Sequence, residues 1–139
     1  MNRCVEEGRS GRRPLLAATV LGCVLGLPML LQAQEVVQRS FPANALRGML
    51  EVTDAPDAVL NGRSARLAPG ARIRDTNNLL TMPAAVTGRT LTVHYTLDFG
   101  GQLKDVWILR ADEAARFWPR SAEEAARCSF DPAAQTWTR

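Results

Sequence analysis

The sequence contains few of the residues from which reactive or metal-binding sites are built. Its 139 residues include one histidine, three cysteines and one tyrosine. A metal site needs several ligands that converge at recognisable intervals, and nucleophilic catalysis needs a nucleophile beside an oriented base. His94, the one histidine, meets neither condition by itself. The composition therefore argues against an enzyme, and it predicts no metal and no cofactor.

Lysine is almost absent, because Lys104 is the only lysine among 17 basic residues. Four arginines and two glutamates lie within residues 1–33, so residues 34–139 carry 13 basic and 12 acidic side chains. A balance of this kind provides no broad basic surface for nucleic acid. We therefore expect no nucleic-acid partner.

The longest apolar run has the three parts of a secretory signal peptide. Basic residues up to Arg13 precede the apolar residues 15–31, and Ala33 places a small residue directly before Gln34. We expect residues 1–33 to be removed on export to the periplasm, which would leave no stable membrane span. The Arg12-Arg13 pair leaves the twin-arginine route open beside the Sec route.

Residues 34–139 would then form one domain without a disulfide. Cys128 would be its only cysteine, so the fold must depend on an apolar core. We expect Cys128 to be buried on a short helix as a small apolar residue, and pairing with a partner chain is the alternative.

The clearest structural pattern is a β-hairpin between residues 89 and 110. Apolar residues alternate with polar ones from Leu91 to Leu97, which is typical of a half-buried strand, and a Gly-Gly turn leads into a second strand. This alternation places His94 on the solvent-facing side, among threonines.

The register of this hairpin can be predicted from its apolar residues. If Leu97 lies opposite Leu103, then Val93 faces Trp107 and both lie in the core. The same register sets Tyr95 opposite Asp105. That mismatch requires either a hydrogen bond from the phenol to the carboxylate or a β-bulge near Lys104.

Further short strands are expected between residue 47 and this hairpin. Asn61-Gly62 lies between two strand-like runs and predicts a type I′ turn that pairs Leu60 with Arg63 and Asp57 with Arg66. Ala68-Pro69-Gly70 predicts another turn. The pattern predicts an all-β domain at residues 47–110, a small barrel or roll of six to seven short antiparallel strands.

The segments on either side of this domain differ from it. Residues 34–46 predict an extended lead-in, in which Phe41 is the expected anchor. Residues 111–139 predict a C-terminal extension with one or two short helices, the second capped by Ser121, and a loose end. Trp118 and Trp137 lie in this extension. They are either exposed contact residues or packed back on the sheet.

A resemblance to known proteins covers residues 41–115. The run from Leu60 to Asn78, followed by Tyr-Thr-Leu-Asp and Val-Trp-Ile-Leu in the hairpin, resembles an uncharacterised family of small exported proteins of Gram-negative bacteria. The resemblance implies a periplasmic β-rich core. It implies no activity, and it does not extend beyond Trp118.

Four arginines form the candidate binding site. Arg63, Arg66, Arg72 and Arg74 crowd two neighbouring strands, with Arg39 and Arg47 upstream. Such a cluster can bind anionic partners such as lipid headgroups, but it can also be an ordinary solvated face that protects a sheet edge.

The sequence favours a non-enzymatic periplasmic binding or accessory module that contacts an anionic envelope component or an envelope protein. The alternative is a small hydrolase or a metal-binding protein that uses His94. As a metal ligand His94 would need Met49, Met82 or Cys128 nearby, and none of them stands at ligand spacing.

Overall fold

The structure, a computed structural model, describes residues 37–139, so the predicted signal peptide at residues 1–33 lies outside the described part. The chain there is mostly β, as the sequence predicts. No helix among residues 37–139 is long and apolar enough to cross a membrane. The elements in chain order are β1 (Leu46–Asp54), β2 (Asp57–Leu60), β3 (Arg63–Arg74), β4 (Leu80–Thr81), the short 3-10 helix η1 (Pro83–Val86), β5 (Thr90–Leu97), β6 (Leu103–Ile108), α1 (Ala111–Ala115), α2 (Ala122–Ala125), β7 (Ser129–Asp131) and β8 (Thr136–Thr138).

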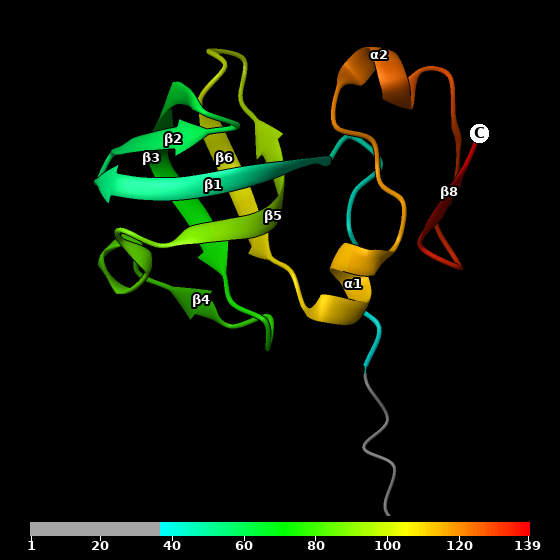
Figure 1. Cartoon of the computed structure of the whole chain (residues 1–139), viewed down its shortest axis with the longest axis horizontal. Coiled ribbons are helices and arrows are strands. Elements are labelled where there is room, and N and C mark those ends of the chain that lie inside the picture. The colour runs from blue at the N-terminus through cyan, green and yellow to red at the C-terminus, as the bar shows by residue number, and fades with distance from the viewer. Residues whose placement is uncertain (1–36) are drawn as a thin grey trace, which may run out of the picture. The chain divides into compact units, whose positions relative to one another are not determined.

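Six strands form one sheet that closes partly into a ring (Figure 1). Their order is β2-β1-β5-β6-β3-β4, and β2 also pairs with β3. Strands β1 to β3 follow one another in space, and β5 returns beside β1, which is a Greek-key path. The prediction of antiparallel strands fails at one pair, because β4 and η1 carry the chain across and β6 then runs parallel to β3.

The β2–β3 turn has the predicted geometry. Asn61 and Gly62 have φ values of 53° and 78°, and the register pairs Leu60 with Arg63 and Asp57 with Arg66. The turn predicted at residues 68–70 does not end a strand, so that prediction is wrong. There β3 bends but continues, and its register with β6 shifts between Leu67 and Arg72.

The hairpin of β5 and β6 contains a bulge that redirects its second strand. Leu97 lies opposite Leu103 as predicted, but the register shifts between Thr96 and Leu97. Beyond this point Val93 faces Ile108, and Trp107 faces His94. The predicted Val93–Trp107 pair is therefore wrong. The alternative of a bulge near Lys104 accounts for the mismatch at Tyr95.

Two apolar clusters form as a result. The first lies inside the ring and includes Leu50, Val52, Val93, Leu103 and Val106, each at most 2% exposed. Burial of one such side chain contributes about 1.5–3 kcal/mol. The second lies on the outer side of β5 and β6 and consists of Phe41, Ala45, Trp107, Leu109 and Trp118.

The C-terminal extension covers this second cluster. Helices α1 and α2 form as predicted, and Ser121 caps α2 by accepting the N–H of Glu124 at 3.2 Å. The expectation of a loose end is wrong, because β7 and β8 form a hairpin. Trp118 packs back against the sheet segment, with 4% of it exposed, and its Nε1 donates to the carbonyl oxygen of Ala45 at 2.8 Å.

Candidate functional site

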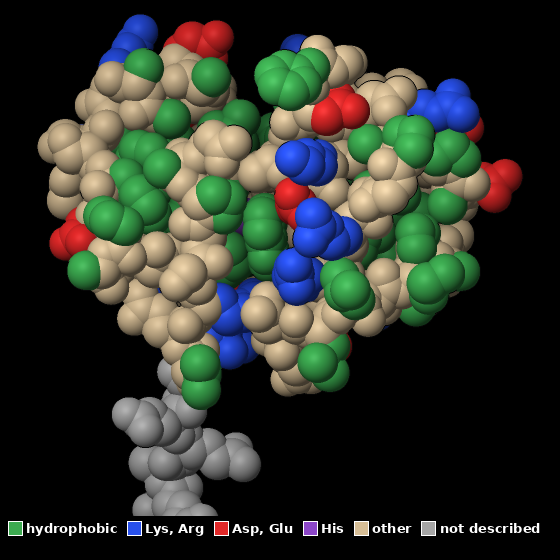
Figure 2. All heavy atoms as spheres, turned by 180° about the vertical axis from the view of Figure 1, so that it is seen from behind, with side chains coloured by type: hydrophobic (Ala, Val, Ile, Leu, Met, Phe, Trp, Pro, Cys, Tyr) green, Lys and Arg blue, Asp and Glu red, His purple; other side chains and the backbone are tan. Residues whose placement is uncertain are grey.

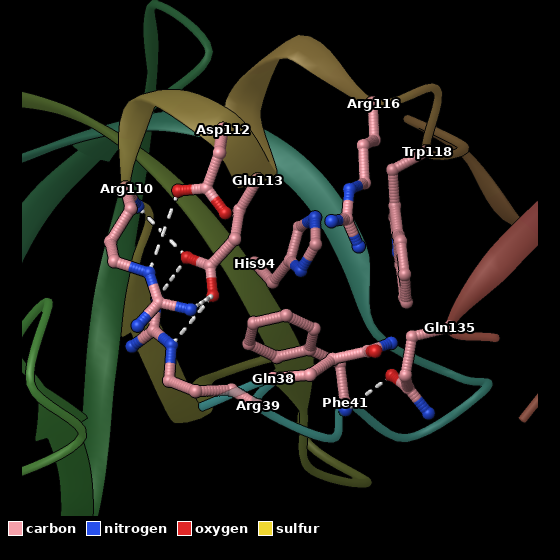
Figure 3. Close-up of a pocket in the computed structure, with 10 residues that line it drawn as sticks. All are labelled: Gln38, Arg39, Phe41, His94, Arg110, Asp112, Glu113, Arg116, Trp118 and Gln135. Carbon is pink, nitrogen blue, oxygen red and sulfur yellow. Dashed lines mark hydrogen bonds and ion pairs between the residues drawn. The ribbon is translucent and has the colours of Figure 1, made fainter. Parts of the chain in front are cut away.

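A cavity of about 130 Å³ lies between the outer side of β5, the lead-in and the C-terminal extension (Figure 3). Residues of the lead-in and of the C-terminal extension thus meet at this cavity. The cavity is lined by Gln38, Arg39, Phe41, His94, Arg110, Asp112, Glu113, Arg116, Trp118 and Gln135. Sequence reasoning singled out His94 for chemistry and missed Glu113 and Arg116.

His94 is buried, with 1% of its surface exposed, which contradicts the predicted solvent-facing position. The threonine-lined side of β5 is covered at His94 and Thr96 by residues beyond the sheet, whereas Thr90 remains exposed. The imidazole lies edge to face against Phe41, with ring centroids 4.6 Å apart, and 4.2 Å from the ring centroid of Trp118. The covering residues come from segments that no local pattern connects with β5.

Arg47 fixes the protonation state of this histidine. Its Nη2 lies 3.3 Å from Nε2 of His94 and 2.9 Å from the carbonyl oxygen of Glu113, and its Nη1 lies 2.9 Å from that of Ala114. A guanidinium has donors only, so Nε2 accepts and the ring proton resides on Nδ1. Burial, followed by the charge of Arg47, lowers the pKa of His94 from 6.5 to about 3, so the ring is neutral.

The proton on Nδ1 has no hydrogen-bond acceptor among residues 37–139, although the atom is buried. Buried polar groups almost always have a partner, and each exception requires an explanation. This donor lies on the ring that lines the cavity.

Glu113 anchors α1 beneath the cavity. Its carboxylate accepts two hydrogen bonds from the guanidinium of Arg39, one of them 2.8 Å long, and one of 2.9 Å from the backbone N–H of Arg110. Burial raises the pKa of Glu113, but the bonds from Arg39 and Arg110 outweigh it, and the net shift is downward. Arg39 also donates to the carbonyl oxygens of Asp75 and Ile108.

Arg39 and Arg47 are therefore structural residues, not members of a surface patch. They are 6% and 9% exposed, and their donors are directed at the interior. Arg116 differs from both. It is exposed, and its guanidinium forms no hydrogen bond or ion pair with any residue of the range 37–139. Figure 3 shows it reaching over the cavity between His94 and Trp118.

The residues named for a metal site do not come together. Within the described range, no three His, Cys, Asp or Glu side chains are arranged to hold a metal ion. Met49, Met82 and Cys128 do not line the cavity that contains His94. Cys128 follows α2 instead of lying on it, and it is half-buried.

The predicted arginine cluster is divided by the bend in β3. Arg63 lines a separate hollow with Tyr95 and Arg120. Arg66 is exposed opposite Asp57, but no ion pair joins the two side chains. These two arginines lie on the part of β3 that pairs with β2.

Arg72 and Arg74 remain together on the outward side of β3, beyond the bend. Ile73 between them is 2% exposed, so both arginines point away from the core. Arg72 approaches Asp105 at 3.5 Å while more than half exposed, a contact that contributes little to stability. Arg74 has no ion-pair partner in residues 37–139. Figure 2 shows basic side chains around a carboxylate on the side of β3 and β6.

Exposed apolar side chains lie on and next to β4, the strand that pairs with this part of β3. Leu79, Leu80 and Met82 are 64%, 65% and 73% exposed, and Leu80 pairs with Arg74 across β3 and β4. Figure 2 shows apolar side chains next to the basic ones on this side. We call Arg72, Arg74, Leu79, Leu80 and Met82 the basic–apolar face.

Comparison with models of known protein families finds no match to this chain. Searches of curated proteins and of solved structures find none either. The class of the protein is therefore defined by its own fold and sites: a small Greek-key β domain with a basic–apolar sheet face and an aromatic cavity.

Proposed function

We propose that the chain is a non-enzymatic binding module of the periplasm that docks on anionic envelope surfaces through the basic–apolar face. The observation that carries this proposal is the pairing of Leu80 with Arg74, which places an exposed apolar side chain beside a cation. Anionic membranes attract such a surface in two ways, because apolar side chains enter the headgroup boundary while basic ones interact with the lipid charge.

The size of these effects favours reversible docking. A basic side chain near an anionic membrane contributes about 1 kcal/mol. Arg72 and Arg74 would thus contribute roughly 2 kcal/mol, and the exposed apolar residues on and next to β4 add to this. Docking of this strength suits an accessory module. Arg63 and Arg66 lie outside the face.

The strand path agrees with a binding role. A Greek-key path is shared with OB-folds, which bind ligands on an outer sheet face and its adjoining loops. This analogy supports only the class of function, because one fold serves many functions.

Co-sedimentation with lipid vesicles tests the proposal. We expect the protein to bind vesicles that contain phosphatidylglycerol and not vesicles of phosphatidylcholine alone. The Arg72→Ser/Arg74→Ser variant should bind roughly 30-fold more weakly, the equivalent of about 1 kcal/mol per arginine. Binding should weaken at high salt, because the screening length falls from about 8 Å at 0.15 M to about 3 Å at 1 M.

Two control variants make the test specific. Arg89→Ser/Arg127→Ser removes the same charge from exposed positions elsewhere and should bind as the wild type does. Leu80→Ser should weaken binding at high and low salt alike. An equal loss in the Arg89/Arg127 control, or no binding at low salt, would refute the proposal. The open edge of β4 would then become a candidate site for strand pairing with an envelope protein.

Periplasmic location is part of the same proposal and rests on the signal-like pattern of residues 1–33 and on the family resemblance. Intact-mass measurement of the exported protein should give a chain that starts at or near Gln34. A mass that retains residues 15–31 would indicate an anchored protein instead.

The alternative, a hydrolase or metal-binding protein that uses His94, has less support. A general base needs a free lone pair, but Nε2 of His94 accepts from Arg47 and Nδ1 carries the proton. The low pKa of His94 also favours a neutral hydrogen-bond donor over a proton acceptor.

A further inference from the structure

The cavity beside His94 combines donors that lack a hydrogen-bond partner with aromatic walls. These donors are the guanidinium of Arg116, the buried Nδ1–H of His94 and the buried Nε–H of Arg110, which lies 3.5 Å from Asp112. Phe41 and Trp118 lie against the imidazole, and both line the cavity.

The side chains of Gln38, Gln135 and Arg39 at the cavity already have acceptors. Gln38 donates to the carbonyl oxygen of Ala134 at 2.9 Å, and Gln135 donates to that of Pro132 at 2.9 Å. Arg39 is occupied by Glu113 and by two backbone carbonyl oxygens. Arg110 is paired with Asp112 and Glu113, although its buried Nε forms no hydrogen bond. Among residues 37–139, the guanidinium of Arg116 is therefore the charged donor at the cavity without a partner, and Nδ1–H of His94 is the neutral one.

The charges of the cavity favour an anion. Three guanidinium groups line it against the two carboxylates of Asp112 and Glu113, and a fourth, that of Arg47, lies behind His94. Glu113 is neutralised by its bonds to Arg39 and Arg110. An organic cation would meet this positive field, although aromatic walls alone would suit one.

The volume limits the size of the ligand. At about 130 Å³ the cavity holds more than a single water, whose share of liquid volume is about 30 Å³. It is smaller than the roughly 300–1,000 Å³ of pockets for drug-sized molecules. A nucleotide or an oligosaccharide would therefore extend beyond it. A molecule of a few heavy atoms fits.

We propose that this cavity binds a small aliphatic monocarboxylate, whose carboxylate is held by Arg116 and by Nδ1–H of His94 and whose apolar end lies against Phe41 and Trp118. A planar guanidinium matches a carboxylate in a two-point arrangement. Phosphate carries more charge and more acceptors than one guanidinium and one neutral N–H satisfy. The site is separate from the basic–apolar face, so it does not depend on the proposed docking function.

The single histidine makes a direct test possible, because its imidazole nitrogen resonances need no assignment. We would titrate the protein with acetate, propionate and butyrate while recording proton–nitrogen correlations of the imidazole. The Nδ1–H resonance should move and saturate. Affinity should rise about fourfold with each added methylene, because the apolar end is buried. Propionamide, which has the same shape without the charge, should leave the resonance unchanged.

Variants of Arg116 complete the test. This side chain is exposed and bonds to no residue in the described range, so Arg116→Gln should fold normally. The variant should bind propionate about tenfold more weakly or worse, as expected for loss of a charge-assisted hydrogen bond. Arg116→Lys should bind with intermediate affinity, and Arg89→Gln, the charge-matched control, should bind as the wild type does.

Four outcomes would overturn the proposal. If carboxylates do not move the Nδ1–H resonance, this group only faces the ring of Phe41 and holds no ligand. An equal response to propionamide would remove the role of charge. Equal weakening in Arg89→Gln would indicate an unspecific charge effect. A larger response to phosphate than to propionate would show that the ligand class is wrong.

Discussion

Folding stability should depend on pH mainly through His94 between pH 7.5 and pH 5. Burial, with the charge of Arg47 next, lowers the pKa of His94 from 6.5 to about 3. In this range the unfolded chain binds a proton at the imidazole while the native chain does not. Stability therefore falls as the pH falls below 6.5, and the loss continues until the pH reaches the native pKa.

The expected size follows from these two values. With pKa values of 6.5 and about 3, the free energy of unfolding should decrease by about 2 kcal/mol from pH 7.5 to pH 5, and by roughly 5 kcal/mol once the pH is below 3. The first figure is the useful one, because carboxylates titrate mainly below pH 5. It is a large part of the roughly 5–15 kcal/mol typical of a domain.

Urea unfolding followed by tryptophan fluorescence measures this dependence at pH 5, 6 and 7.5. The His94→Gln variant provides the control, since glutamine can still accept from Arg47 but does not titrate. Its stability should be flat over the range, whatever its absolute value. An imidazole pKa within one unit of 6.5 by NMR, or the same pH slope in His94→Gln, would refute the reasoning.

Two further predictions concern packing. Trp107→Ala should lower the free energy of unfolding by about 3–5 kcal/mol and Thr92→Ala by less than about 0.5 kcal/mol, because only Trp107 fills an apolar cluster. Equal losses of the two variants in urea unfolding would contradict the observed register. Deletion of residues 129–139 removes the contacts of Phe130 and Trp137 with Trp118, whose ring centroid lies 5.5 and 5.9 Å from theirs, and should lower the free energy of unfolding by about 1–3 kcal/mol. An unchanged free energy in urea unfolding would show that the β7–β8 hairpin does not support the packing of Trp118.

The sequence predicts features that depend on neighbouring residues. Asn61-Gly62 specifies its own turn because both positions require positive φ, and with the turn it fixes the β2–β3 register. Leu97 and Leu103 are paired because they flank a short glycine turn. In both cases the information lies within a few residues of the chain.

Features that depend on distant segments could not be predicted in this way. Arg39 looks like a surface cation in the sequence, yet its partner Glu113 lies 74 residues away. Likewise, the alternation in β5 indicates which residues share a face but not whether that face is covered. For this reason Arg116 and Glu113 were missed, and no short motif marks them.

The cavity itself depends on a one-residue shift in the register between β5 and β6. Without the bulge near Lys104, Trp107 would lie with Val93 inside the ring, as the unbroken alternation predicts. With it, Trp107 faces His94 on the outer side, where Phe41 and Trp118 can pack against both. A one-residue shift exchanges the two faces of a strand. The bulge thus moves a large aromatic residue out of the first core, and the second cluster, the burial of His94 and the cavity beside it all follow from that exchange.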